Sequence, residues 1–274
     1  MKLACYIKKD RLRGDARVES LLVRLRAAGH TLYAVAQPSD FLPETDALLS
    51  LGGDGTFLLG ARLAVLAGVP VLGVNFGRLG FLSENDPDMV VEALSTGDYR
   101  VEERELLQIS CPDLPAEESW PYALNEISVS RVSPSMLGVD VAVDGEALPT
   151  YWADGLLVAT SSGSTAYSLS VGGPICLPET KVFIVAPISP HNLNVRPLIV
   201  PETSRLSITL RSRDARAVLS MDNRNYTVPA GARIEVSAAP MRLRRLRLGG
   251  SNFINALRSR LLWGEDVRNG GSQD

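Results

Sequence analysis

The sequence predicts an α/β domain at the N-terminus followed by a β-rich domain of the β-sandwich type. Two observations lead to this fold class. Over residues 1–104, apolar strand-like runs alternate with amphipathic segments of helical length. From about Glu105 onward, short β-branched runs are separated by turn residues, which is typical of antiparallel β structure.

The composition limits the class of protein. With 274 residues and 45% hydrophobic content, the chain can bury a large core. Its net charge of −3 gives no overall attraction to nucleic acid. Cys5, Cys111 and Cys176 have no metal-ligand or redox spacing, so we expect reduced, buried thiols. No apolar run is long enough for a signal peptide or a membrane span, so we expect a cytoplasmic protein that contacts no membrane.

The first elements alternate strand, helix and strand. The runs KLACYI and TLYAVA predict strands at 2–7 and 31–36, and RVESLLVRLRAAGH predicts a helix at 17–30. A second such unit follows, with strand DALLSL (46–51), a glycine-rich turn, helix TFLLGARLAVLAG (56–68) and strand VPVLGVN. Ligand sites in parallel sheets lie at the carboxyl ends of the strands, where the glycine-rich turn falls.

The second half contains the predicted antiparallel strands. These are LQISCP, NEISVSRV, VDVAVDGEAL, DGLLVAT, KVFIVAP, RLSITLRS and RIEVSAA. In MRLRRLRLGG (241–250) arginines alternate with leucines, which indicates either a basic patch or a strand with one solvated face. We favour the strand because no aromatic residues are interleaved for base stacking. The tail predicts a helix in SNFINALRSRLLWG and disorder in NGGSQD (269–274).

The turn SLGGDGTFLLGA places Asp54 among three glycines at the start of a helix. Gly52, Gly53 and Gly55 allow close approach of a ligand, and the helix N-terminus offers N–H groups to an anion. The turn matches neither of the common phosphate-binding motifs, GxxxxGK[ST] and GxGxxG. Asp54 can accept a proton from an attacking hydroxyl or hold a metal ion that carries phosphates. The alternative is that Asp54 only caps a helix that begins at Thr56.

A hydroxyl-rich loop follows a predicted strand in the second half. It offers neutral donors and acceptors to a ribose, an amide or a base, and its alternative is a Ser/Thr turn and helix cap. The loop is DGLLVATSSGSTAYSLSVGG, residues 154–173, with hydroxyls at Thr160, Ser161, Ser162, Ser164 and Thr165.

Together these stretches resemble the NAD kinase family. The motifs that carry the resemblance occur in the family's order and cover most of the chain from about Asp46: GGDGTFL, GVNFGRLGFL, LNEISVSR, DGLLVATSSGSTAYSLSVGGPI, APISPHNLNVRPLIVP and RSRLLWG. The glycine turn alone is weakly specific, because lipid kinases and phosphofructokinases look similar there. The long Ser/Thr motif is strongly specific.

The resemblance implies phosphorylation of NAD at the 2′-hydroxyl of its adenosine ribose, with ATP or another donor and a divalent metal ion, Mg²⁺ with ATP. Asp54 would be the general base. Asn125 and Glu126 would hold ribose hydroxyls or the adenine, Asp154 would face the nicotinamide, and Phe81 would pack by the adenosine half. The remaining substrate-binding residues implied are Gly55, Ser162, Thr165, Ala166, Tyr167, Ser168 and Ser170.

The resemblance also implies the domain organisation. A phosphate-donor domain would comprise residues 1–104 plus 251–274, so that the C-terminal segment returns to it, and a dinucleotide-binding domain would comprise 105–250. The family forms homodimers or homotetramers, and we expect the run KVFIVAP to need a partner surface. In the family the nicotinamide end of the site borders a neighbouring subunit.

The sequence departs from the family at three positions. Ser161 stands where proline is usual, Asn223 where glycine is usual, and Trp152 where many bacterial members have arginine. From Trp152 we expect a preference for NAD over NADH. Two other functions stay open: a lipid kinase that shares the glycine turn, and a dinucleotide sensor that keeps the pocket without turnover.

Overall fold

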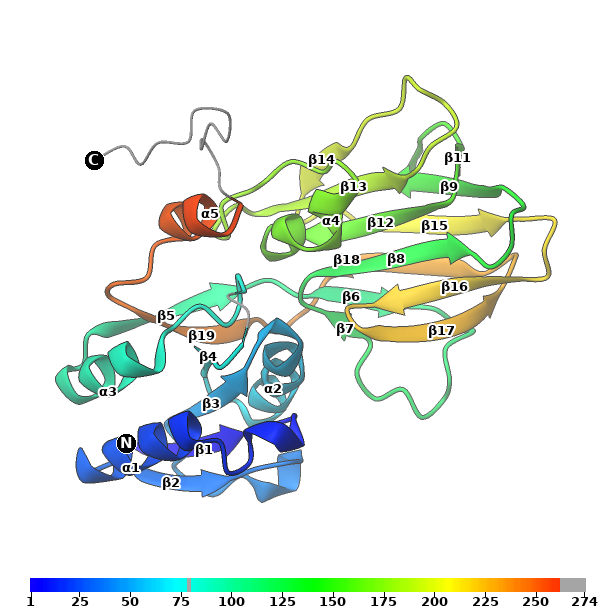
Figure 1. Cartoon of the computed structure of the whole chain (residues 1–274). Helices are drawn as coiled ribbons and strands as arrows, with labels where there is room; N and C mark the ends of the chain where they lie inside the picture. Colours follow the sequence, from blue (N-terminus) through cyan, green and yellow to red (C-terminus); the bar gives the residue numbers. More distant parts are fainter. Residues whose placement is uncertain (78–79, 262–274) are drawn as a thin grey trace. The chain divides into compact units, whose positions relative to one another are not determined.

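The computed structural model describes residues 1–77 and 80–261 and divides the chain into two compact units (Figure 1). The first unit comprises Met1–Glu102 and a segment that begins at Arg244, and the second comprises Glu103–Leu243. The end of the RSRLLWG motif and the NGGSQD tail lie outside the described residues. None of the described helices is long and apolar enough to cross a membrane.

The first unit is built around a six-stranded sheet with β1 (Lys2–Tyr6), β3 (Ala47–Gly52) and β4 (Val71–Asn75) at its centre. The order of the sheet is β2-β1-β3-β4-β19-β5, with β2 at Thr31–Ala34, β19 at Leu243–Leu248 and β5 at Tyr99–Arg104. The pairs from β2 to β19 are parallel. The predicted α/β domain is confirmed.

The helices of the first unit follow the predicted alternation. Apolar residues of α1 (Ala16–Ala27) and α3 (Pro87–Thr96) share one core with residues of β1, β3 and β4. Helix α2 (Asp54–Ala67) ends at Gly68, whose left-handed φ of 67° is typical of a glycine C-cap. The remaining elements are η1 at Asp10–Leu12, η2 at Pro38–Asp40 and α5 at Phe253–Leu261.

The arginine-rich run corrects two expectations. We expected MRLRRLRLGG to form a strand, and Leu243–Leu248 do form one, β19. We also expected this strand to have one solvated face and to lie in a second domain that extends to residue 250. Instead, β19 is an interior strand of the first sheet, between β4 and β5. Arg245 is buried and donates to the Glu84 carboxylate, and Arg247 donates to Glu102 over 2.8 Å. Carboxylates with little solvent exposure therefore partner these two arginines.

The second unit is a sandwich of two antiparallel sheets (Figure 1). One sheet has the order β10-β9-β15-β18-β6-β7, with β11 also paired to β9. Its strands are β6 Leu107–Ser110, β7 Tyr122–Ala123, β9 Leu137–Val143, β10 Glu146–Ala147, β11 Tyr151–Ala153, β15 Leu206–Arg211 and β18 Arg233–Ala238. Apolar side chains of both sheets form one core, and the predicted β-rich domain is confirmed.

The other sheet carries the loop of interest. Its order is β14-β13-β12-β8-β16-β17, and the Ser/Thr loop follows β12, an interior strand. The strands are β8 Glu126–Arg131, β12 Gly155–Thr160, β13 Val182–Ile188, β14 Leu198–Pro201, β16 Arg216–Met221 and β17 Arg224–Pro229. The loop itself forms η3 (Ser162–Thr165) and α4 (Tyr167–Ser170).

The run KVFIVAP does not need a partner surface. It forms β13, which is buried from Phe183 to Ile188. Phe183 and Val185 face the sandwich core, while Ile184 and Ala186 lie in a second cluster with Cys176. Both faces of the strand are therefore covered within this chain. The thiols of Cys5, Cys111 and Cys176 are free and buried, as expected.

Candidate functional site

The glycine turn connects β3 to α2 at the carboxyl edge of the first sheet. A Cβ atom on Gly52 would lie 2.5 Å from Oγ1 of Thr56, so a side chain cannot be added there without displacing α2. Gly53 is the N-cap, and α2 begins at Asp54. Gly52 is paired with Asn75, so the ends of β3 and β4 lie side by side at this edge.

The Asp54 carboxylate is held by the loop that follows β4. Oδ2 accepts the N–H of Phe81 at 2.9 Å, and Oδ1 accepts the N–H groups of Leu82 at 3.1 Å and Ser83 at 2.8 Å. A Cβ atom on Gly80 would lie 1.9 Å from Oδ1, so this approach requires glycine. The alternative that Asp54 caps a helix starting at Thr56 is therefore wrong, because the helix starts at Asp54 and its carboxylate bonds to another segment.

A cavity of about 460 Å³ opens beside Asp54. Glycine backbone forms much of its wall, while the exposed side chains of Lys9 and Arg11, from the segment after β1, bring positive charge to it. Exposed backbone N–H groups, a helix N-terminus and two cations suit a phosphate chain. The cavity is lined by Lys9, Arg11, Leu12, Gly52, Gly53, Asp54, Gly55, Phe76, Gly77 and Gly80.

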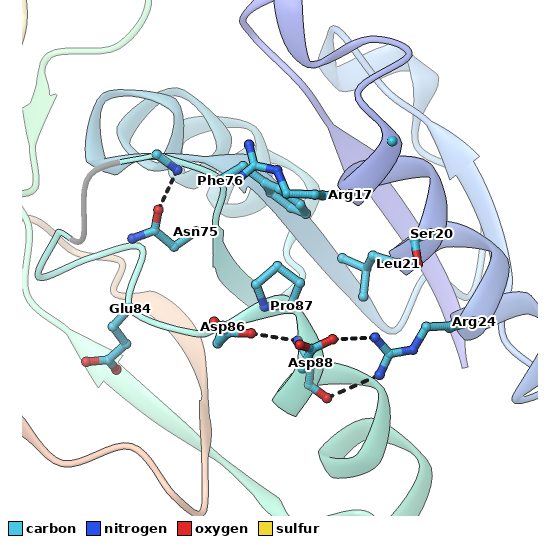
Figure 2. Close-up of a pocket in the computed structure, with 12 residues that line it drawn as sticks. Arg17, Ser20, Leu21, Arg24, Asn75, Phe76, Glu84, Asp86, Pro87 and Asp88 are labelled. Carbon is cyan, nitrogen blue, oxygen red and sulfur yellow. Dashed lines mark hydrogen bonds and ion pairs between the residues drawn. The ribbon is translucent and has the colours of Figure 1, made fainter.

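A second cavity, of about 550 Å³, shares Phe76 and Gly77 with the first. Figure 2 shows that α1 and the segment after β4 line it. The Arg17 guanidinium lies 5.9 Å from the centre of the Phe76 ring, and Oδ1 of Asn75 accepts the N–H of Gly77 at 2.7 Å. The volume is within the range of small-molecule sites. Phe76 and Gly77 thus connect the linings of two cavities in the first unit.

The expected return of the C-terminal segment is confirmed for its described part. Helix α5 belongs to the first unit, and the ring of Phe253 lies 6.0 Å from the ring of Phe81. Phe81, which the resemblance places near the adenosine half, therefore contacts α5.

In the second unit the Ser/Thr loop packs directly on Asn125. The hydroxyl of Thr160 donates to the carbonyl oxygen of Leu124 at 2.6 Å, and the N–H of Gly163 donates to that hydroxyl at 3.0 Å. A Cβ atom on Gly163 would lie 2.1 Å from the carbonyl oxygen of Asn125. The sequence pattern did not show that these two motifs would meet, because they lie more than thirty residues apart.

Three buried polar atoms around this loop lack a hydrogen-bond partner in the described part of the chain. They are Oε2 of Glu126 and the hydroxyls of Ser162 and Ser168. A buried polar group without a partner is costly, and a native protein usually supplies one. A ligand with hydroxyl or amide groups would supply partners here, which favours the dinucleotide site over a purely structural turn.

Glu126 sits beside a second buried acid, Asp222, in the turn between β16 and β17. Burial raises the pKa of Glu126 from 4.5 to about 8; Asp222 adds to the rise and the backbone N–H of Tyr167 opposes it. The Asp222 carboxylate accepts the N–H groups of Leu124 at 2.9 Å and Asn125 at 2.8 Å. The raised pKa favours the protonated form of Glu126 at neutral pH, and its O–H can then donate a hydrogen bond to a ligand.

Asp222 was not identified as a site residue from the sequence. Only its neighbour Asn223 attracted attention, as a departure from glycine. Asp222 has the left-handed φ of 50°, and Asn223 is not among the described residues with positive φ. Asparagine therefore fits at position 223. The sequence signal that could have pointed to Asp222 is a two-residue turn between two runs of alternating apolar residues.

The remaining predicted residues lie in or near the same sheet. Asp154 pairs with Arg131, with 2.9 Å between Oδ1 and Nε. Tyr167 is 42% exposed, and the hydroxyl of Thr165 lies 3.5 Å from the carbonyl oxygen of Ser162. Thr165 is in η3, Ala166 follows it, and Ser168 and Ser170 are in α4. Asp54, Gly55 and Phe81 belong to the first unit, so the predicted residues form two groups, one in each unit.

The departure at Ser161 has its own buried partner. Its backbone N–H and its hydroxyl both donate to Oε1 of Glu105, which is buried. Proline at 161 would lose both donors, and the Glu105 carboxyl would lose these partners. The departure at Trp152 lies on β11, where the ring is 46% exposed and packs against Gly138.

A carboxylate at the edge of a cationic, glycine-lined cavity has the parts that a phosphotransferase requires. Comparison with known proteins gives the particular family. Residues 34–97 match the model of the ATP-NAD kinase N-terminal domain, and residues 124–248 match that of the ATP-NAD kinase C-terminal domain.

Individual relatives agree. An NAD kinase from Porphyromonas gingivalis is 38% identical, with 97% of this chain and 99% of the relative covered. An NAD kinase from Bacteroides fragilis is 40% identical, with 82% of this chain and 79% of the relative covered. This chain belongs to the NAD kinase family, and the resemblance read from its motifs is confirmed.

Solved structures with the same fold include two kinases with bound ligands. Yeast NADH kinase complexed with NADH has a TM-score of 0.83 at 26% identity, and the match covers 98% of this chain and 89% of that one. An NAD kinase from Archaeoglobus fulgidus in complex with ATP has a TM-score of 0.75 at 27% identity, and the match covers 94% of this chain and 99% of that one.

The raised pKa of Glu126 predicts a pH-dependent stability. Between pH 4.5 and 8 the folded state keeps a proton on Glu126 that the unfolded state releases. The contribution of Glu126 to the free energy of unfolding is therefore full below about pH 4.5 and is lost as pH rises through 8. The variant Glu126→Gln, which has no ionisable group at this position, removes this pH dependence. From pH 6 to pH 9 we expect the wild type to lose about 2–3 kcal/mol of unfolding free energy relative to this variant.

Urea unfolding at both pH values measures the difference. The control is Glu146→Gln, which removes an exposed carboxylate of the same unit and should follow the wild type. Parallel curves for the wild type and Glu126→Gln would show that Glu126 ionises normally in the folded state.

Proposed function

We propose that this chain transfers the terminal phosphoryl group of ATP to the 2′-hydroxyl of the adenosine ribose of NAD, which gives NADP and ADP. Membership of the NAD kinase family supports the substrates. The single observation that supports the chemistry is the Asp54 carboxylate, held at the mouth of a glycine-lined cavity that carries two cations.

Asp54 is the proposed general base. Its carboxylate has about four positions that can accept a hydrogen bond, and three backbone N–H groups occupy positions on it. One position is left for the 2′-hydroxyl, and the bound N–H groups fix the direction in which it points. As the hydroxyl oxygen attacks the phosphorus atom, its proton passes to Asp54 and the bond to ADP breaks.

The second unit binds NAD in this proposal. Glu126, as a neutral acid, and Asn125 hold ribose hydroxyls or the adenine, and the unpartnered hydroxyls of Ser162 and Ser168 donate to the same half. Thr165, Ala166, Tyr167 and Ser170 line the dinucleotide, and Asp154 lies toward the nicotinamide.

The donor lies in the two cavities of the first unit. Its phosphates occupy the smaller cavity with Lys9 and Arg11, and its nucleoside occupies the larger one. Magnesium enters as part of the MgATP substrate, because Mg²⁺ is usually held by substrate phosphates and a few carboxylates rather than by a protein cage. Among the described residues, His, Cys, Asp and Glu side chains form no group of three that could hold a metal ion.

Assembly into a homo-oligomer, most simply a tetramer, also belongs to the proposal. Exposed apolar side chains gather in sequence around β14, and a partner copy would cover them: Leu193, Leu198 and Ile199. The expected cytoplasmic location agrees with three free thiols, because disulfides are rare in reducing compartments.

Asp54→Asn tests the proposed base together with the reaction. NADP formation from NAD and MgATP should be measurable for the wild type. In the variant, turnover should fall on the order of 10²–10⁴-fold, because an amide cannot take the proton. NAD binding should change little. The control Asp10→Asn removes an exposed carboxylate outside both cavities and should retain turnover.

No NADP from the wild type with any triphosphate or polyphosphate donor would overturn the reaction. Tight NAD binding without turnover would instead favour the dinucleotide sensor. A wild-type rate in Asp54→Asn would remove Asp54 from the base role and leave the reaction standing.

Filling the larger cavity tests where the nucleoside lies. Ser20→Trp places a large ring on α1 inside the cavity and should raise the KM for ATP about tenfold, while the KM for tripolyphosphate, which has no nucleoside, stays constant. Glu19→Trp is the matched control, because Glu19 is the neighbouring residue of the same helix and does not line the cavity. Equal increases for both donors would contradict the placement.

Light scattering tests assembly. The wild type should be an oligomer whose specific activity falls on dilution, and NAD should shift the equilibrium back. Leu193→Asp should dissociate it at higher concentration, whereas Leu66→Asp, an exposed leucine of α2, should not. A fully active wild-type monomer at micromolar concentration would rule out the proposed assembly.

A further inference from the structure

Arg260, in the last turn of α5, lies close to the proposed base. Its guanidinium carbon is 4.7 Å from the centre of the Phe81 ring. The N–H of Phe81 in turn donates to Oδ2 of Asp54. Phe253, whose ring contacts that of Phe81, is the first residue of the same helix, so α5 contributes both an aromatic ring and a cation beside Phe81.

The guanidinium of Arg260 has unused hydrogen-bond donors. Its Nε and Nη1 atoms are buried and have no partner in the described part of the chain. Glu84 is the acid whose charge acts most strongly on Arg260. Its Oε1 already accepts from Arg245 and from the hydroxyl of Ser251. Leaving donors of a buried charge without partners is costly.

The positive charge of Arg260 is partly removed from solvent. Burial lowers the pKa of Arg260, and the charge of Arg245 adds to this effect, whereas Glu84 and Asp54 oppose it. An anionic ligand between Arg260 and Asp54 would satisfy the free N–H groups. The positive charge of Arg260 would also offset the negative charge of Asp54, which otherwise repels a phosphate placed next to the base.

We infer that Arg260 binds the phosphoryl group that is transferred and is a further catalytic residue of this chain. The inference rests on the proposed function. As the 2′-oxygen bonds to phosphorus and the bond to ADP breaks, negative charge develops on the phosphoryl oxygens and on the leaving oxygen. The Nε and Nη1 donors of Arg260 stabilise that charge while Asp54 takes the proton. No further reactant is needed.

The test compares Arg260→Met and Arg260→Lys with Arg258→Met. Methionine keeps an apolar stem against Phe81 and removes the charge; lysine keeps the charge without the planar fork. Arg258 is an exposed arginine of the same helix and serves as the control. Titration with ATP in the absence of NAD gives the affinity for the donor, and steady-state rates separate kcat from KM.

Arg260→Met should weaken ATP binding about 10- to 100-fold and lower kcat about 10²- to 10³-fold, with NAD affinity unchanged. Arg260→Lys should recover part of the ATP affinity and part of kcat, and Arg258→Met should match the wild type. Thermal unfolding of each variant excludes a loss of fold, and the lysine variant carries the test if the methionine variant does not fold.

Wild-type ATP affinity and kcat in folded Arg260→Met would overturn the inference while NADP formation by the wild type upholds the proposed function. A loss of NAD affinity alone would place Arg260 on the pyrophosphate of NAD and overturn the assignment to the donor. ATP binding that depends on Arg260 in a wild type that makes no NADP would contradict the proposed function and keep the phosphate site.

Discussion

The hydrogen bonds from the backbone N–H groups of residues 81–83 to the Asp54 carboxylate are the constraint on which the first half of the site depends. They join the turn after β3 to the segment after β4, and they require Gly80 to lie almost in contact with the carboxylate oxygens. Because both strands end at the same edge of the sheet, a single charged side chain can fasten both turns. The two cavities that Phe76 and Gly77 line, and the aromatic contact with α5, depend on the position of this segment.

The second half of the site is organised by another buried carboxylate. Asp222 accepts N–H groups at the start of β8 and thereby places Glu126 in a position without full solvation. Two buried acids side by side disfavour ionisation of both, so one carries the proton. In each unit, therefore, a carboxylate that bonds to backbone fixes a loop.

Much of the fold could be predicted from the sequence, and the reasons are local. The periodicity of residues 2–75 predicted four strands and two helices, because each of these elements has its own apolar pattern, and a glycine such as Gly68 marks where a helix ends. The arginines of β19 could not be interpreted in this way. Their pattern is that of a half-solvated strand, and only the carboxylates of Glu84 and Glu102, which are distant in sequence, make an interior position tolerable. Long-range charge pairing leaves no periodic signal.

The candidate site shows the same division. Motifs with unusual composition, the glycine turn and the Ser/Thr loop, could be recognised directly. Lys9 and Arg11 could not, because two cations after a strand are ordinary until the sheet order brings β1 next to β3. Arg260 belongs to a recognisable motif, but its free donors depend on which acids Arg245 and Ser251 already occupy. The roles of individual site residues remain predictions of the family resemblance.

The interior position of β19 has a consequence for the order in which the chain folds. Strands β1 to β4 are synthesised first, but the strand that lies between β4 and β5 is made only after the whole second unit. During translation the edge of β4 stays unpaired until β19 has been synthesised. The second unit, by contrast, is continuous in sequence and can fold as soon as it leaves the ribosome. Closing the first sheet then brings together residues more than 170 positions apart, as in the pair Val71 and Arg245, which makes it a slow, high-contact-order step. The half of the protein that is made first is therefore the half that is completed last.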